Sequence, residues 1–346
     1  MITDEVRPFL EICGSGERGL FSVAEGLARG RLRGEKVPEL AELSARLRAQ
    51  GEPHVWPRAW VASHPSGDRV ALLESFRAFR LGLRGEGEAR CGISVERTPG
   101  GAMVVAVVAI DALADLAPLK TRARAGEWLT VEAKLLVPIQ GAKIVITGPN
   151  GAPRSVPSGL SGRTLRGRFA PDAPGAFTVQ VLADTVRGPR PVVEARVFAE
   201  IEPTARINAS VPGEGAAQGA QGAEALFRMI QSLREERGLP RLRRDPRLDA
   251  VALRQAEAMK SRRLLGHDLG EGDPRERLEE AGHSARVVGE NVANAGRTEL
   301  LHRALYESPS HQGNLLRPDF DAVGVAVVAD ERGELWGCEL FAAGLR

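Results

Sequence analysis

The sequence is poor in cysteine and aromatic residues and has no long hydrophobic run. Its three cysteines, Cys13, Cys91 and Cys338, form no CxxC pair, so the usual spacing of a structural zinc site is absent. Aromatic residues make up 4% of the chain, which disfavours a base-stacking surface for nucleic acid. No apolar run reaches the roughly 18 residues of a membrane span. The formal net charge of +2 gives no global attraction to nucleic acid or to a membrane surface.

The N-terminus has neither the basic region nor the apolar stretch of a signal peptide. Either the protein is cytosolic, or it is extracytoplasmic and its signal segment is not part of this sequence. Cys13 and Cys91 can form a disulfide in an oxidising compartment. Buried free thiols are the equal alternative.

A chain of 346 residues exceeds one ordinary core, so several domains are expected. Composition and punctuation predict an α+β multidomain protein with four regions: an α+β module at 1–115, an immunoglobulin-like β-sandwich at 118–200, a flexible linker at 203–222 and an α+β domain at 223–346. The sandwich is expected from short alternating strands separated by Gly-Pro turns. The linker is expected because its residues are small and offer little apolar surface.

In the first module, apolar spacing predicts helices over 19–33, 37–50 and 68–83, followed by strands over 91–95 and 103–110. His54 and His64 lie between the helices, close to Trp56 and Trp60. No matched acidic partner accompanies them in the sequence, so the tryptophans are expected to pack and the imidazoles to have no role.

In the last region, apolar spacing predicts four helices. The first covers 223–237, the second runs from a cap at Asp245 to about residue 265, and the others cover 274–281 and 299–307. Strands are predicted over 322–328 and 335–342. Ser308-Pro309 is expected to break the fourth helix, with His311 just past that turn. His283 and His302 fit no motif and are expected in solvent. Asn291 is expected to bind loop backbone.

Polar motifs follow one another within this region. They are Leu265-Gly266-His267-Asp268, Gly289-Glu290-Asn291-Val292-Ala293 and Ser308-Pro309-Ser310-His311-Gln312-Gly313-Asn314. In this order they resemble the CAP superfamily of cysteine-rich secretory proteins, antigen 5 and pathogenesis-related proteins, in its bacterial secreted type. The resemblance covers about a third of the chain and implies an α-β-α sandwich.

The resemblance also implies a cleft with two histidines and two acidic residues. Carried over to this sequence, the histidines are His267 and His311, and the first acid is Glu290. The second acid departs from the pattern, because Ser308 stands at its position. Glu307 is the nearest substitute, although a regular helix turns it about 100° away.

Two neutral imidazoles that face one cavity can hold Zn²⁺ or another divalent cation, so His267 and His311 are candidate metal ligands. Glu290 is the candidate catalytic base on bound water, or it orients an imidazole. The structural alternative is that Glu290 only joins neighbouring loops.

Two functions remain open. The favoured one is an extracytoplasmic binding module whose cleft recognises a small molecule, a lipid or a cell-envelope component, with or without a metal. The alternative is a metal-dependent hydrolase with His267 and His311 as ligands and Glu290 as base. Ser308 and Ser310 adjoin His311 without a nucleophile-elbow motif, which favours binding.

The first module contains a further pattern. Gly92 and Gly101 have the same mutual spacing as Gly324 and Gly333, and each pair begins a hairpin that follows a helix. Residues 1–115 are therefore either a degenerate CAP-like copy without the site residues or an unrelated α+β module.

Overall fold

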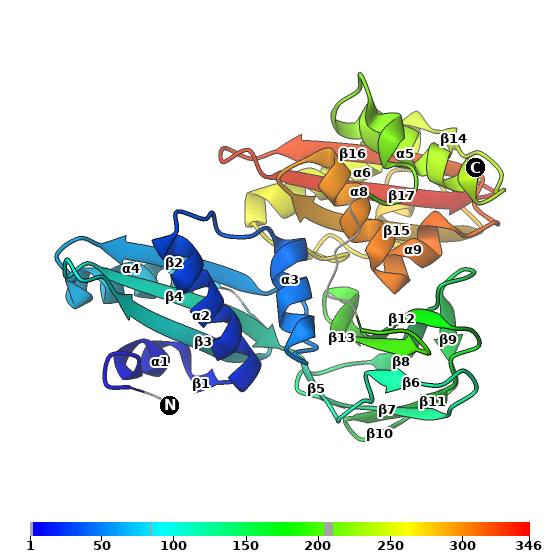
Figure 1. Ribbon diagram of the computed structural model, residues 1–346. Helices are drawn as coiled ribbons and strands as arrows, with labels where there is room; N and C mark the ends of the chain where they lie inside the picture. Colours follow the sequence, from blue (N-terminus) through cyan, green and yellow to red (C-terminus); the bar gives the residue numbers. More distant parts are fainter. Residues whose placement is uncertain (1–2, 84, 204–209) are drawn as a thin grey trace. The chain divides into compact units, whose positions relative to one another are not determined.

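The computed structural model describes residues 3–83, 85–203 and 210–346. The chain divides into two compact units. The first comprises Met1–Pro138, Pro157–Phe177 and Pro191–Ile207, and the second comprises Ile139–Val156, Thr178–Arg190 and Asn208–Arg346. Figure 1 labels the helices and strands in chain order. None of the helices in the described residues combines the length and apolar character needed to cross a membrane.

The helices of the described residues are α1 Arg7–Cys13, α2 Arg18–Leu32, α3 Leu40–Ala49, α4 Arg69–Gly82, α5 Gly222–Glu236, α6 Pro246–Arg262, α7 Pro274–Glu280, α8 Thr298–Glu307 and α9 Pro309–Leu315, with the 3₁₀ turn η1 Glu214–Ala217. The strands of the first module are β1 Ser15–Gly16, β2 Arg58–His64, β3 Glu88–Arg97 and β4 Met103–Ala112. The strands of the middle region are β5 Ala114–Leu116, β6 Arg122–Ala123, β7 Leu129–Leu135, β8 Gly141–Thr147, β9 Arg154–Val156, β10 Ser158–Ser161, β11 Thr164–Phe169, β12 Gly175–Thr185 and β13 Gly188–Ala199. The strands of the last region are β14 Arg243–Arg244, β15 Val287–Ala295, β16 Ala322–Ala329 and β17 Leu335–Ala343.

The N-terminal module is a four-stranded sheet in the order β1-β3-β4-β2 with helices on both faces. Successive residues of β4 point to opposite faces, as a strand requires. Val104, Ala106 and Val108 pack with α2 and α3, whereas Val105 and Val107 pack with α1 and α4. The predicted helices and hairpin are present, and the short helix α1 and the strand β2 were not predicted.

Cys13, at the end of α1, forms a disulfide with Cys91 in β3, and their Cα atoms are 6.2 Å apart. The bond closes a loop with a sequence separation of 78. Of the two open alternatives for these cysteines, the structure therefore has the disulfide. Cys338 is a buried free thiol.

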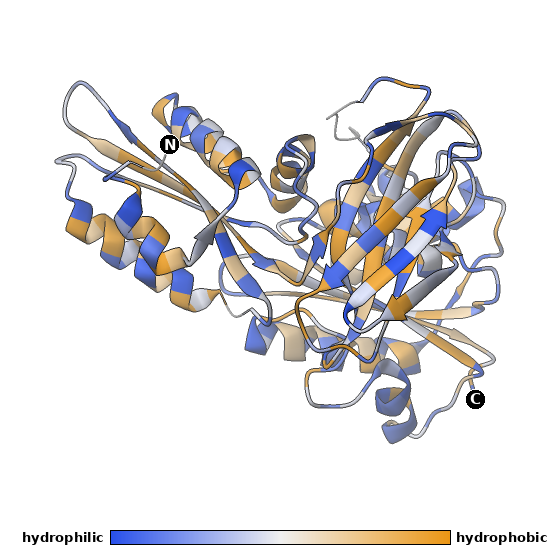
Figure 2. Ribbon diagram, turned by 90° about the horizontal axis from the view of Figure 1, so that it is seen from below, coloured by the Kyte–Doolittle hydropathy of each residue, from blue (hydrophilic) through white to orange (hydrophobic). Residues whose placement is uncertain are grey.

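Residues 114–199 contain nine strands and no helix, as the turn pattern predicted for this region. The strands form two sheets, in the orders β10-β11-β7-β5 and β6-β13-β12-β8-β9. The hydropathy colouring in Figure 2 shows hydrophobic and hydrophilic residues alternating along several strands. The assignment to an immunoglobulin-like sandwich stays a prediction, as do the boundaries of the regions.

The segment predicted as a flexible linker is partly folded. Residues 204–209 lie outside the described residues. Beyond them, Val211 and Ala217 are buried, and the carbonyl of Pro212 lies 2.8 Å from Nε2 of His302. Glu214 forms an ion pair with Arg303. Residues 211–217 are therefore ordered by contacts that composition alone does not reveal, and His302 is buried, contrary to the prediction that it lies in solvent.

The C-terminal domain is an α-β-α sandwich around a sheet in the order β14-β16-β17-β15. One face packs against α5, α8 and α9 through Val323, Val325 and Phe341. The other face packs against α6 and α7 through Ala322, Ala326 and Leu340. The closing hairpin was predicted, but the edge strands β14 and β15 were not.

Candidate functional site

The site is built on β15, an edge strand of the C-terminal sheet that carries the Gly289-Glu290-Asn291 motif. Gly289 allows two side chains to approach this strand closely. A Cβ at this position would lie 2.8 Å from Phe320 and 2.9 Å from the Asn314 amide oxygen. Successive residues of a strand point to opposite faces, so the side chains of Glu290 and Asn291 serve two different networks.

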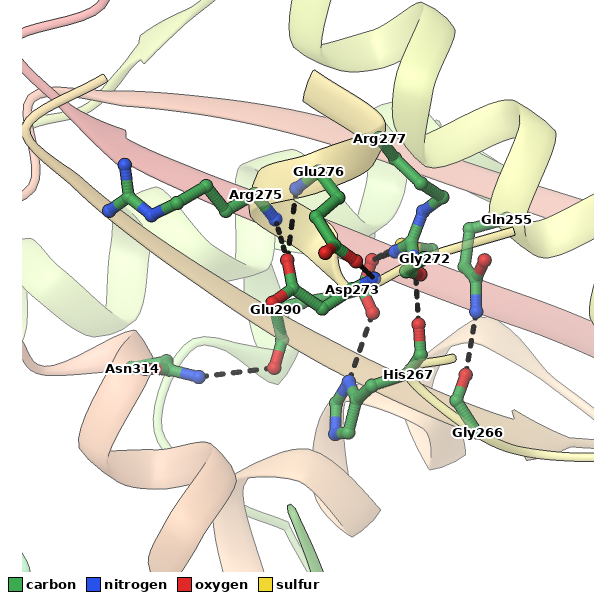
Figure 3. Close-up of polar contacts among 11 residues, drawn as sticks. Gln255, Gly266, His267, Gly272, Asp273, Arg275, Glu276, Arg277, Glu290 and Asn314 are labelled. Atoms are coloured by element: carbon green, nitrogen blue, oxygen red, sulfur yellow. Dashed lines mark hydrogen bonds and ion pairs between the residues drawn. The ribbon is translucent and has the colours of Figure 1, made fainter. Parts of the chain in front are cut away.

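Glu290 contacts His267 with one carboxylate oxygen and a buried arginine with the other (Figure 3). Its Oε1 lies 2.9 Å from Nδ1 of His267, and its Oε2 pairs with Arg277. The Cys338 thiol also donates to Oε2, at 3.5 Å. The side chain of Glu290 is 1% exposed and that of His267 is 14% exposed. Both carboxylate oxygens are therefore occupied by protein donors.

The hydrogen bond from His267 fixes the orientation of its ring. A carboxylate that faces a guanidinium acts as an acceptor, so Nδ1 of His267 donates to it. In the tautomer that this bond selects, the lone pair lies on the other ring nitrogen, Nε2. This carboxylate–histidine arrangement is the one that orients imidazoles toward a ligand or a metal.

Arg277 completes the site and was missed by the sequence analysis. Its side chain is 1% exposed, and its Nη1 donates to the carbonyls of His267 and Gly272, the latter at 2.7 Å. It sits on α7, which a capping box formed by Asp273 and Glu276 begins. The capping residues could have been recognised in the sequence. The burial of this arginine could not, because charged residues on a short helix normally face water.

Asn291 links the strand to α9 on the other face of the sheet. Its amide donates to the carbonyl of His311 at 3.2 Å and to the carboxyl of Glu339 at 2.9 Å. Asn314 donates to Asn291 and to the backbone carbonyl of Glu290. Asn291 therefore binds backbone, as expected, but the backbone of helix α9 instead of a loop, and its contact with Glu339 was not predicted.

Glu339 is a fully buried carboxyl group that the sequence analysis did not single out. Burial raises its pKa to about 8, and the bond from Asn291 only partly opposes this. Its Oε1 has no hydrogen-bond partner among the described residues. At neutral pH the group therefore carries a proton, and its position in a closing strand gave no signal of that.

The fourth helix, α8, ends at Glu307, so the break at Ser308-Pro309 is present as predicted, and His311 lies two residues beyond Pro309. The second helix that begins at this proline, α9, was not predicted, because a proline in the first turn begins a helix as readily as it ends one. Burial of the ring lowers the pKa of His311 to about 3, and the positive charge that His267 can carry contributes to a smaller extent. The imidazole is neutral at pH 7. The backbone carbonyl of His311 accepts from Asn291, the neighbour of Glu290, which joins this residue to the site through its main chain.

Glu307 is the last residue of α8, and Ser308 is the N-cap residue of α9. Ser308 Oγ accepts a hydrogen bond from the amide of Gln180 at 3.1 Å, and it lies 3.3 Å from Oγ of Ser310. The Gln180 oxygen accepts from the backbone N–H of Ser310. The two serines are thus bound to a glutamine of β12.

A turn of the same compact unit lies against His267. The carbonyl of Arg187 accepts from the backbone N–H groups of His267 and Asp268, at 3.1 and 3.2 Å. A Cβ on Gly188 would lie 3.0 Å from Cβ of His267. Residues 180–188 therefore line one side of the site, which no motif in the sequence indicated.

The two imidazoles do not come with a third metal ligand among the described residues. Among all described residues, three potential ligand atoms lie within 4.8 Å of one another at Glu17, Glu52 and His54, in the N-terminal module. Metal binding by His267 and His311 therefore stays a prediction. A catalytic zinc usually has three protein ligands.

Comparison with known proteins gives one family match. Residues 227–340 match the CAP family, described as the cysteine-rich secretory protein family. The uncharacterised protein YkwD of Bacillus subtilis (strain 168) is 29% identical over 113 residues, which are 32% of this chain and 43% of that protein. The chain thus matches less than half the length of this relative.

Solved structures also match this chain, among them the following two. An outer surface protein from Borrelia burgdorferi is 24% identical with a TM-score of 0.33, over 35% of this chain and 91% of that one. An extracellular protein with an SCP domain from Bacillus anthracis str. Ames is 15% identical with a TM-score of 0.32, over 66% of this chain and 88% of that one.

Proposed function

With residues 227–340 forming a CAP domain, we propose that this domain is an extracytoplasmic binding module and that Nε2 of His267 receives the ligand. The ligand class is a small molecule, a lipid headgroup or a cell-envelope component with a hydroxyl or amine group that can donate to this nitrogen. The disulfide supports an oxidising compartment. The relative from Bacillus anthracis is described as extracellular.

The observation that carries the proposal is the double engagement of Glu290. A general base needs a free oxygen within reach of the water it deprotonates. Oε1 of Glu290 is bound to His267, while Oε2 is bound to Arg277 and Cys338. The carboxylate is therefore suited to orient His267 rather than to activate water.

The remaining cleft groups fit recognition better than turnover. Ser308 and Ser310 interact with Gln180 rather than with an imidazole that could activate a nucleophile. His311 can join His267 in holding a divalent cation such as Zn²⁺. Because Nδ1 of His267 is bound to Glu290, the cation would occupy Nε2, and the ligand would then reach the site through the cation instead of through this nitrogen. We regard this cation as an accessory to binding.

The test is a binding measurement with Zn²⁺ as the probe, on the full chain and on His267→Ala and His311→Ala. The matched control is His283→Ala, an imidazole of the same domain outside the cleft. We expect both cleft variants to weaken cleft-bound Zn²⁺ and the control to leave it unchanged. Zn²⁺-dependent hydrolysis of ester or amide substrates that both cleft variants abolish would replace binding with catalysis as the function.

A second test addresses Glu290. Glu290→Gln keeps the shape of the side chain but removes its negative charge. In a binding module this variant weakens binding without affecting any turnover, because the orientation of His267 changes. The variant also removes the charged partner of Arg277, so its unfolding temperature is measured alongside binding. Loss of a measurable hydrolytic rate in Glu290→Gln, with Zn²⁺ affinity unchanged, would assign Glu290 the role of base.

A further inference from the structure

Three residues of the N-terminal module converge although no sequence motif joins them. Glu17 is the N-cap of α2, Glu52 follows α3, and His54 precedes β2. Nε2 of His54 lies 3.4 Å from Oε2 of Glu17 and 3.9 Å from Oε2 of Glu52. His54 is 5% exposed, and its Nδ1 has no hydrogen-bond partner among the described residues. The imidazole, expected to have no role, is buried and aimed between two acids.

The separations are long for hydrogen bonds and suitable for ligands around a cation. A direct N–H···O bond is about 2.7–3.2 Å long. Ligand atoms that are each about 2.0–2.2 Å from a tetrahedral zinc ion lie roughly 3.3–3.6 Å from one another. The shorter of the two observed separations falls in that range, and all three ligand atoms lie within 4.8 Å of one another.

The outer oxygen of each carboxylate is held by a donor, so the inner oxygens point toward the imidazole. Arg90 donates to Oε1 of Glu17 at 2.6 Å. The backbone N–H of Gly19, in the first turn of α2, donates to Oε1 of Glu52 at 3.1 Å. Such outer contacts orient metal-binding carboxylates. The side chains are mostly shielded, with exposures of 28% for Glu17 and 12% for Glu52.

The charges around the cluster are unbalanced. Arg90 is shared among Glu17, Glu88 and Asp115, so its single positive charge faces three carboxylates before Glu52 is counted. The two carboxylates that face His54 therefore bring more negative charge than the neighbouring arginine balances, and a divalent cation would supply the missing positive charge.

We propose that Glu17, Glu52 and His54 form a binding site for a divalent transition-metal ion, separate from the CAP cleft. One imidazole and two carboxylates suit Zn²⁺ better than Mg²⁺, because imidazole nitrogen is a ligand that zinc prefers and magnesium does not. The ion would tie the start of α2 to the connection between α3 and β2. Its role is to stabilise the N-terminal module.

The test removes the cleft histidines first, so that the two sites are measured separately. In the full chain carrying His267→Ala and His311→Ala, equilibrium dialysis should find one Zn²⁺ ion retained per chain. Adding His54→Ala or Glu52→Gln should weaken this binding by more than the roughly 10–100-fold that loss of an outer partner produces. His64→Ala, which removes another imidazole of the same module, should leave it unchanged.

Glu52→Gln guards against a trivial loss of folding, because the amide resembles the protonated acid in shape and charge. Zn²⁺ should raise the unfolding temperature of the double-histidine background and leave that of its Glu52→Gln derivative unchanged. Retention of Zn²⁺ by both the His54→Ala and Glu52→Gln derivatives at the affinity of the background would overturn the proposal. So would a background chain that retains no Zn²⁺.

Discussion

The two helix-covered sheets of this protein share one topology and differ in their polar groups. In the N-terminal sheet, β1 runs parallel to β3, and β4 pairs antiparallel with β3 and β2. In the C-terminal sheet, β14 runs parallel to β16, and β17 pairs antiparallel with β16 and β15. The helices cover corresponding faces of the two sheets. In the N-terminal sheet, α2 and α3 cover one face and α1 and α4 the other. In the C-terminal sheet, α6 and α7 cover one face and α5 and α8 the other.

The registers agree residue by residue. Gly92 opposes Val108, as Gly324 opposes Leu340, and both hairpins close with the same loop length. A Cβ on Gly92 would collide with the backbone of Leu20, and a Cβ on Gly324 with the backbone of Leu248. Each glycine thus allows the first turn of a helix to approach a strand. We infer that residues 1–115 are a degenerate CAP-like copy rather than an unrelated module.

The difference lies at the positions of the site. By register, Glu290 corresponds to Ala59 and Asn291 to Trp60. Trp60 packs against Phe76 and Phe79, so an aromatic cluster fills the place of a polar network. The fold therefore depends on apolar alternation and on two close glycine contacts. The Glu–Asn network is an addition that the same fold can lack.

The largest expected effect on stability comes from replacing Arg277. This arginine pairs with Glu290, and the position equivalent to Glu290 in the N-terminal sheet holds an alanine. Arg277→Met leaves Glu290 buried without its cation and should lower the free energy of unfolding of the C-terminal domain by about 3–5 kcal/mol. Urea unfolding measures this loss. In Arg277→Met/Glu290→Gln the loss should be smaller than the sum of the single losses, and strictly additive losses would show that the pair is not coupled.

The disulfide should separate the stabilities of the two sheets. Cys13→Ala/Cys91→Ala opens a loop with a sequence separation of 78, so the N-terminal module should lose about 4 kcal/mol. The C-terminal domain contains only the free Cys338 and should be unaffected. Hydrogen exchange followed by mass spectrometry resolves the two regions. Equal loss of protection in both would mean that they do not unfold separately.

The paired glycines test the shared packing. Gly92→Ala and Gly324→Ala should each lower the free energy of unfolding by about 3 kcal/mol, because the added methyl group meets backbone that cannot move aside. Gly26→Ala is the matched control on the exposed face of α2, where a Cβ meets nothing within 4 Å. This control should stabilise by up to about 1 kcal/mol. A tolerated Gly92→Ala beside a disruptive Gly324→Ala would break the equivalence of the sheets.

The smallest expected effect concerns Glu339. The equivalent position in the N-terminal sheet, by strand register, is Val107. The pKa of Glu339 is raised to about 8, so between its unfolded value near 4.5 and that value the native state holds one more proton than the unfolded state. Its contribution to stability is therefore fully present below pH 4.5 and is lost as the pH rises toward 8. From about pH 6 to about pH 7.5 the loss should be at most about 2 kcal/mol.

Glu339→Gln should remove this part of the pH dependence, as urea unfolding at several pH values would measure. Glu331→Gln, in the exposed turn between β16 and β17, is the control for the loss of one carboxyl group. If the wild-type protein and Glu339→Gln lose stability equally over that pH range, the buried carboxyl group is not protonated in the native state.

The predictions from sequence succeeded where the signal is local. The helix over 68–83 and the cap at Asp245 were predicted, and the carboxylates of Asp68 and Asp245 accept backbone N–H groups at the starts of α4 and α6. The hairpins were identified from alternation and from turn residues. The short edge strands β1 and β14 were missed, because two residues carry no periodicity. His302 was placed in solvent because the segment that covers it lies far away in the sequence.

The sequence by itself determined the longer helices, the closing hairpins and the CAP motifs, because spacing and capping act over a few residues. Only the tertiary structure decided that Arg277 occupies the second oxygen of Glu290, that Glu339 holds a proton, and that His54 lies between two acids. Burial and charge depend on which distant segments exclude water from a group. That information resides in the packing of the elements and in no single stretch of the chain.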